Sequence, residues 1–200
     1  MMKNKLDLLI DKARILGLTY DNTIPDDLRA IYHTADSIRR PLAAVELEKV
    51  CKFSGIDSTP IQLLQEKAPA IVTAVKNRLL AEEPELIQMG GALYPEVRAL
   101  ACWRDCWHFL RIAIYALAAD RTEFTHRPGV NGLGELYREL NVPIASMARA
   151  LSHLRNESVA CYSAVGGSRD AWRLDAALLH LEEMLKDLSL IQTPGPTLPT

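Results

Sequence analysis

The apolar residues of this chain recur at intervals of three and four, the period of an amphipathic helix. The pattern predicts helices over residues 6–16, 24–38, 42–53, 61–80, 94–120, 132–140, 143–162 and 170–190. No run shows the alternation with a period of two that a half-buried strand requires. We therefore predict an all-α protein. Within it, Pro69 predicts a kink or break, and Pro128 with Gly129 predicts a stretch through which no helix passes.

The longest uninterrupted stretch, residues 94–120, should form the central helix. At about 25 residues it would be roughly 37 Å long, and its only proline, Pro95, stands where a helix can begin. Its apolar stripe comprises Val97, Leu100, Ala101, Trp107, Leu110, Ile114 and Leu117. A helix of this length and apolar character is expected to have other helices packed around it.

Composition narrows the class of protein. The 200 residues are 48% apolar, which fits one domain with a sizeable core. The net charge of −2 gives no electrostatic basis for a nucleic-acid partner. The N-terminus lacks the apolar run of a secretory signal, and the longest apolar run, residues 112–119, is far below the roughly 20 residues of a membrane span. We expect a soluble intracellular protein.

The four cysteines are Cys51, Cys102, Cys106 and Cys161. None forms a CxxC pair, and no second pair of cysteines or histidines at ligand spacing accompanies Cys102 and Cys106. We therefore expect reduced thiols and no zinc site.

Polar groups gather on the central helix. Arg98, Cys102, Asp105 and Cys106 follow at i, i+4, i+7 and i+8, so they share one face. A guanidinium, a thiol and a carboxylate together offer an anion clamp, a nucleophile and a hydrogen-bond acceptor. Arg104 lies about 200° from Cys102 around the helix, so its spacing alone does not place it in the same site.

Each of these residues also has a plain structural interpretation. A cysteine in a helix is often a small buried hydrophobic residue, and an Arg–Asp pair is often a surface ion pair. Trp103 and Trp107 could wall a planar ligand or simply fill the core. His108 lies about 240° from Cys102. We interpret it as a part-exposed or hydrogen-bonded helix histidine, with haem ligation as the alternative.

Residues 81–120, AEEPELIQMGGALYPEVRALACWRDCWHFLRIAIYALAAD, resemble the heart of the phycobiliproteins, the bilin-bearing globin-like subunits of phycobilisomes. The matched positions are Pro84, Leu86, Gly90, Gly91, Tyr94, Arg98, Ala101, Cys102, Arg104, Asp105, Leu110, Arg111, Tyr115, Ala116 and Asp120. Residues 130–151, VNGLGELYRELNVPIASMARAL, are similar to the helix and turn that follow in the family. The clear resemblance covers roughly residues 81–154.

The resemblance implies a fold and a division of the chain. Residues 41–190 would form a globin-like, bilin-binding helical bundle. Residues 1–40 would form a two-helix extension used for dimerisation, and residues 191–200, rich in proline, would be disordered.

The resemblance also implies roles for single residues. Cys102 matches the cysteine whose sulfur forms a thioether with ring A of an open-chain tetrapyrrole. Asp105 matches the carboxylate that accepts hydrogen bonds from the inner pyrrole N–H groups. Arg98 and Arg104 match the cations that bind the two propionates, a task that suits a forked guanidinium.

Four further positions have expected roles. Tyr94, a matched position, and Trp103, whose flat ring could wall the ligand, are expected in the cofactor site. Arg111 and Tyr115 match positions where one subunit meets an acid on the N-terminal helices of its partner.

Several departures from the family pattern indicate a divergent member. Ala92 stands where β-type subunits carry an asparagine, Ala119 replaces a glycine, and Gly134 replaces a basic residue. Trp103 replaces a small or aliphatic residue next to the cysteine. Such a chain could belong with the phycobilisome-like globins that are associated with bilin biosynthesis.

The implied function is a bilin-binding protein with one pigment of phycocyanobilin type on Cys102, in phycobilisome light harvesting or at its periphery. The alternatives are a pigment-free or transient carrier of bilin, or less favourably haem, during biosynthesis or assembly, and a structural subunit without pigment. An enzyme is not expected, because no general base is paired with Cys102. Expected partners are a phycobiliprotein-like subunit or a second copy, with a bilin lyase as a further candidate. The expected location is the cytoplasm, at the thylakoid face.

Overall fold

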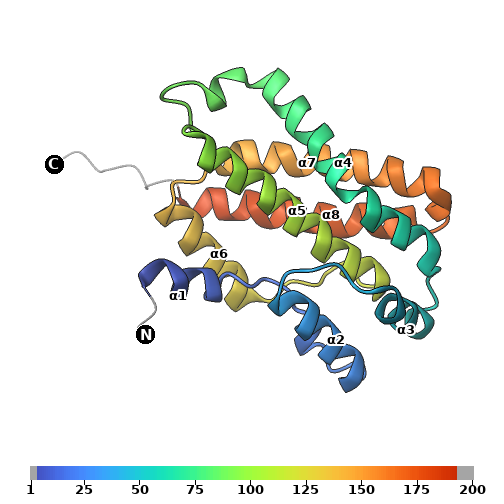
Figure 1. The fold of residues 1–200 in the computed structure, drawn as a ribbon. Coiled ribbons are helices and arrows are strands. Elements are labelled where there is room, and N and C mark those ends of the chain that lie inside the picture. Colours follow the sequence, from blue (N-terminus) through green and yellow to red (C-terminus); the bar gives the residue numbers. More distant parts are fainter. Residues whose placement is uncertain (1–3, 193–200) are drawn as a thin grey trace.

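The computed structural model describes residues 4–192 of the chain (Figure 1). Its helices are α1 (Lys5–Lys12), α2 (Asp26–Ser37), α3 (Ala44–Ser54), α4 (Ser58–Glu82), α5 (Glu96–Ala118), α6 (Arg127–Glu139), α7 (Ile144–Tyr162) and α8 (Ala171–Gln192). Within the described residues no strand forms beyond an isolated bridge between Leu16 and Thr125. The all-α prediction is therefore confirmed. Helix α8 continues to Gln192. The rest of the predicted disordered tail, residues 193–200, lies outside the described residues, and the tail stays a prediction.

Helix α5 occupies the centre of the molecule, with α4 on one side and α7 and α8 behind it (Figure 1). Every residue from 109 to 119 is buried, which is why this half of the helix is apolar all round. The predicted stripe is wrong in the first half, where Val97 and Leu100 are 67% and 58% exposed. The buried face there carries Ala99, Cys102 and Trp103 instead. Both faces are apolar in sequence, so periodicity could not distinguish them.

The two proline predictions have different outcomes. Helix α4 runs through Pro69, so no break occurs there, and the kink stays a prediction. The prediction that no helix passes through Pro128 and Gly129 is wrong. Helix α6 begins at Arg127 and includes Pro128 and Gly129. Pro128 falls in the first turn, where a backbone N–H would have no partner within the helix.

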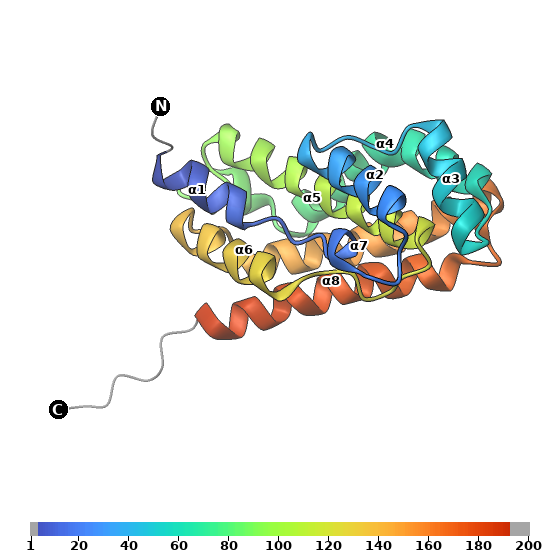
Figure 2. The same ribbon diagram turned by 90° about the horizontal axis from the view of Figure 1, so that it is seen from below.

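The N-terminal helices pack on the chain that follows them. Helix α1 lies alongside α6, and α2 lies close to α5 (Figures 1 and 2). The rings of Tyr32 on α2 and Tyr115 on α5 are 5.9 Å apart. The division of the chain at residue 40 stays a prediction.

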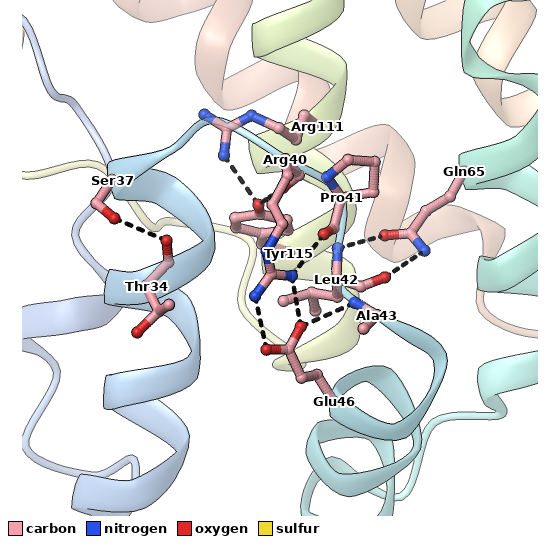
Figure 3. Close-up of polar contacts among 10 residues, drawn as sticks. All are labelled: Thr34, Ser37, Arg40, Pro41, Leu42, Ala43, Glu46, Gln65, Arg111 and Tyr115. Carbon is pink, nitrogen blue, oxygen red and sulfur yellow. Dashed lines mark hydrogen bonds and ion pairs between the residues drawn. The ribbon is translucent and has the colours of Figure 1, made fainter.

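A buried ion pair fastens the end of α2 to α5. Arg111 is 6% exposed and donates to the Asp36 carboxylate at 2.7 Å and to the Tyr115 hydroxyl at 2.9 Å. The Tyr115 hydroxyl in turn donates to the backbone carbonyl of Arg40. The Arg40 guanidinium makes two hydrogen bonds to Glu46, at 2.6 and 2.7 Å (Figure 3).

The linker between α2 and α3 is held from the other side as well. The backbone N–H and C=O of Leu42 both bond to the Gln65 side chain on α4, at 3.1 and 3.2 Å (Figure 3). Glu46 accepts from the backbone N–H of Ala43 and so caps the start of α3. The linker is therefore fixed to α4 and α5 by side-chain contacts to its own backbone.

Removing the Asp36 carboxylate from the buried ion pair with Arg111 should destabilise the whole protein. Asp36→Asn leaves the buried Arg111 guanidinium without its counter-charge, and we expect a loss of about 3 kcal/mol in the free energy of unfolding. Urea denaturation followed by circular dichroism measures it. The matched control is Asp27→Asn on the same helix, which breaks only the exposed pair with Lys49. Equal effects of the two substitutions would show that the buried pair has no special role.

Candidate ligand-binding site

A cavity of about 480 Å³ opens between α1, the first half of α5, and α6. Four residues predicted for the cofactor site line it: Arg98, Cys102, Arg104 and Asp105. Arg104 therefore reaches the same site as Cys102, which its spacing alone did not predict. Two predicted residues are not among the lining residues. Trp103 is 8% exposed and packs into the core, and Tyr94 is 44% exposed before α5 begins.

The polar groups of α5 follow one row along the cavity wall. Cys102, Asp105, His108 and Arg111 succeed each other at intervals of three residues, and all four line the cavity. Each step advances about 4.5 Å along the axis and turns by about 60°. The row therefore winds slowly around the helix. For this reason His108 reaches the cavity, although it lies about 240° from Cys102 around the helix axis.

The two cysteines of α5 are not equivalent. Cys102 is a free thiol on the cavity wall, whereas Cys106 is fully buried, with its sulfur 3.9 Å from that of Met147. The hydrogen bond with Cys102 and burial both raise the pKa of Cys106 well above its ordinary value. A thiol that stays protonated and enclosed is a poor nucleophile. Only Cys102 is thus placed to react with a molecule in the cavity.

Asp105 is held in the cavity wall by a residue that the sequence did not point to. The hydroxyl of Tyr137 on α6 donates to its carboxylate at 3.0 Å. The nearest cation, the Arg104 guanidinium, stands 3.9 Å away. Burial raises the pKa of Asp105, and the Tyr137 hydrogen bond opposes that rise only in part. The carboxylate can accept further N–H donors from a ligand.

The cavity carries more cations than anions. Its charged residues are Arg14, Arg39, Arg98, Arg104, Arg111, Asp36 and Asp105, a formal surplus of three positive charges. Several of these cations are already engaged. Arg98 donates to the backbone carbonyls of Ala92 and Asn141, at 3.0 and 2.8 Å.

Arg39 was not identified from the sequence. It lies in the linker after α2 with a left-handed backbone φ of 54°. Its guanidinium makes no hydrogen bond or ion pair within residues 4–192. Burial lowers its pKa, and the neighbouring Arg14 and Arg104 add to that effect. A partly buried cation that makes no hydrogen bond or ion pair of its own favours an anionic ligand.

His108 is the neutral member of the row. Burial, together with Arg111, Arg39 and Arg104, lowers its pKa to about 4. Its Nδ1 is enclosed and has no hydrogen-bond partner among the described residues. The imidazole therefore adds a polar group to the cavity near neutral pH without adding charge.

Arg111 and Tyr115 were expected at a subunit interface, facing an acid on the partner's N-terminal helices. Both are buried, and the acid that Arg111 meets is Asp36 of the chain's own α2. In this structure the predicted contact is made within one chain.

Taken together, the site offers a thiol, a carboxylate acceptor and a set of guanidinium groups around an apolar hollow. Among residues 4–192, no group of three or more His, Cys, Asp or Glu side chains could hold a metal ion. None of the helices in that range is long and apolar enough to cross a membrane. The arrangement is suited to an apolar ligand that bears carboxylates and N–H groups.

Comparison with known proteins identifies the family of the chain. The family model described as Phycobilisome protein matches residues 30–185. Allophycocyanin subunit beta-18 of Pyropia yezoensis is 32% identical over 133 residues, which cover 65% of this chain and 79% of the relative. The C-phycocyanin beta chain of Galdieria sulphuraria is 36% identical over 138 residues, which cover 68% and 80%.

A third alignment spans nearly the whole chain. Allophycocyanin subunit beta-18 of Cyanophora paradoxa is 28% identical over 189 residues, covering 94% of this chain and 100% of the relative. The match to the family model takes in most of α2, all of α3 to α7 and most of α8, and it leaves α1 outside. The all-α, globin-like fold implied by the resemblance is thereby confirmed, and the chain belongs to the phycobilisome protein family within the phycobiliprotein superfamily.

Proposed function

We propose that this protein binds one open-chain tetrapyrrole, linked through a thioether to Cys102, and serves light harvesting in a phycobilisome or at its periphery. One observation carries the proposal. The Cys102 thiol and the Asp105 carboxylate stand one helical turn apart on the wall of a cavity whose charged residues leave a positive surplus. The relatives, named as allophycocyanin and phycocyanin beta chains, support it.

The cavity fits such a ligand in size and charge. Its volume of about 480 Å³ lies within the range of roughly 300–1,000 Å³ that small-molecule pockets occupy. A tetrapyrrole with two propionates would offset two of the three surplus positive charges. Apolar side chains of α1 and α6 would meet its ring faces. Of these, Ile10, Leu133 and Leu136 line the cavity.

Attachment at Cys102 would need only the thiol of that residue and a carbon–carbon double bond of the ligand. When a thiol adds across a carbon–carbon double bond, one C–S bond forms and the thiol proton moves to the neighbouring carbon. No oxidant and no leaving group is required. Once bound, the conjugated pigment would supply absorption of visible light. The enclosure and raised pKa of Cys106 favour Cys102 as the attachment point.

Asp105 would hold the centre of the ligand. Its carboxylate can accept hydrogen bonds from the inner N–H groups while Tyr137 fixes its orientation. A carboxylate in that position stabilises positive charge on a protonated pigment. Burial penalises the free carboxylate, so donors from a ligand would lower the pKa of Asp105 toward its ordinary value.

The propionates would be bound by guanidinium groups at the edge of the cavity. Arg104 has a side chain that is 62% exposed and only a distant ion pair, so it is free to turn toward a carboxylate. Arg98 keeps two of its donors on backbone carbonyls and offers the remainder. Arg39 is a third candidate, because it has no partner among the described residues.

A phycobiliprotein-like subunit, or a second copy of this chain, is the proposed partner. Both the family match and the beta-chain relatives support it. The proposed location is the cytoplasmic face of the thylakoid, where phycobilisomes lie. A bilin lyase remains a proposed helper for attachment at Cys102.

Pigment attachment should depend on one cysteine. When the chain is produced with a bilin pathway, we expect colour that survives denaturation, and peptide mass spectrometry should find the adduct on Cys102. Cys102→Ala should remove the covalent pigment because the nucleophile is lost, whereas Cys106→Ala should retain it. Pigment that washes off the wild type on denaturation would instead identify a reversible carrier of bilin. A haem titration of the same samples tests the less favoured ligand.

The carboxylate should tune the pigment without being needed for attachment. With Asp105→Asn we expect covalent pigment on Cys102 but a weakened and blue-shifted visible band, because a neutral amide does not stabilise the protonated pigment. Absorption spectra of native and acid-denatured samples separate this effect from lost attachment. Glu96→Gln is the control, an acid of α5 that does not line the cavity. Spectra that agree among all three proteins would contradict the role of Asp105.

His108 should make the ligand-free protein sensitive to acid. Its pKa is about 4 in the folded state and close to 6.5 in the unfolded chain. Below pH 6.5 the unfolded chain therefore binds a proton that the folded chain rejects, and stability falls until the pH reaches about 4. Between pH 7 and 5 this loss amounts to about 2 kcal/mol.

Replacement of the imidazole isolates that loss. His108→Leu should lose about 2 kcal/mol less than the wild type between pH 7 and 5, measured by urea denaturation at each pH. His33→Leu, on the exposed side of α2, is the control. If the pH dependence of His108→Leu equals that of the wild type, the imidazole is not held neutral by the cavity.

A further inference from the structure

Helix α1 and the residues after it form one wall of the cavity. Figure 2 shows α1 beside α6, on the side of the bundle where the first half of α5 lies. The wall residues are Leu6, Ile10, Ala13, Arg14, Ile15 and Leu16. The match to the family model starts at residue 30, so this whole wall precedes the residues that the model covers. The segment 4–16 is called the α1 wall below.

One end of the α1 wall is firmly seated on α6. A Cβ on Gly132 would lie 2.5 Å from the backbone carbonyl oxygen of Lys12, and a Cβ on Gly129 would collide with that of Arg14. Only glycine lets the two backbones approach this closely. The backbone N–H of His126 also donates to the carbonyl of Ile15 at 2.9 Å. The wall is thus anchored at residues 12–15.

The other end is held far less strongly. Helix α1 has eight residues, and Leu9 is its only buried side chain, at 9% exposure. An isolated helix of this length is marginal in water, so packing must hold it in place. Its ion pairs with α6, Lys5–Glu139 at 2.7 Å and Lys12–Glu135 at 3.9 Å, are solvent-exposed and contribute little.

The thiol beside this wall is little exposed. Cys102 is 7% exposed although it lines a cavity of about 480 Å³. A bulky ligand therefore reaches the sulfur more readily when part of the cavity wall is displaced. The weakly held end of α1, where Leu6 and Ile10 border the cavity, is the segment least costly to displace.

We propose that the α1 wall is a hinged cover of the ligand site, which lifts at its Leu6 end to admit a bulky ligand to Cys102 and closes over it afterwards. The seat on Gly129 and Gly132 is the fixed end of the hinge. The identity of the ligand as a tetrapyrrole rests on the proposed function, but the cover itself does not. It implies that pigment attachment includes an opening step within this chain.

Thiol labelling tests the cover without any pigment. The full-length protein is treated with a maleimide that carries a dye of tetrapyrrole size, and peptide mass spectrometry follows labelling at each cysteine. Ile10→Asp places a carboxylate in the apolar wall and should open the cover, raising the labelling rate of Cys102 about tenfold. Leu8→Asp is the matched control, since Leu8 is 51% exposed and does not line the cavity.

Cys106 serves as an internal standard because it is fully buried one turn further along α5. General loosening of the fold would raise the labelling of both cysteines, so the ratio of Cys102 to Cys106 labelling is the quantity compared. A ratio that rises in Ile10→Asp and not in Leu8→Asp supports the cover. An unchanged ratio in Ile10→Asp, or an equal rise in both variants, overturns it.

A second variant guards against a failure of Ile10→Asp to fold. Leu6→Gln disturbs the free end of α1 without adding charge, and the same ratio should rise in it. The two proposals fail separately. If the ratio responds but no pigment binds to the wild type, the cover stands and the proposed function falls. If pigment binds to Cys102 but the ratio does not respond, the cover falls alone.

Discussion

The pairing of Arg111 with Asp36 is the contact on which the arrangement of the site depends. It lies at the junction of the core and the N-terminal segment, and the Tyr115 hydroxyl extends it to the backbone of the linker. Breaking it would leave the buried Arg111 guanidinium without a counter-charge. It would also loosen the N-terminal segment, which supplies Arg39 and the α1 wall. The ligand cavity therefore depends on the contacts between α5 and the N-terminal segment as much as on α5 itself.

Periodicity predicted which parts of the chain are helical because burial of one face imposes a period of 3.6 residues. It failed where two faces are apolar, as at Val97 and Leu100, since nothing local distinguishes the face that meets the bundle. Proline gave one wrong boundary. At Pro128 the position in the first turn of the helix removes the penalty, whereas at Pro69 the helix continues as its apolar period predicted.

The candidate site could be predicted in part. Cys102 and Asp105 lie close in sequence, so helical spacing and a family resemblance were enough to bring them together. Tyr137 and Arg39 could not be found in this way. Each comes from another element and reaches the cavity only through packing, with Tyr137 lying 32 residues beyond the carboxylate it orients. Trp103 shows that closeness in sequence does not ensure a shared face, because it is next to the cysteine but is buried and does not line the cavity.

The positions of Cys102, Asp105, His108 and Arg111 around α5 depend on the number of residues between them. Each member relies on a step of three residues to reach the same hollow, while the core behind α5 is apolar over a wide arc. Insertion of one residue between Asp105 and His108 would turn the two halves of the row by about 100° relative to each other. The site could thus be lost while every one of its side chains is retained, so a divergent copy of this protein should be judged by its spacings before its residues.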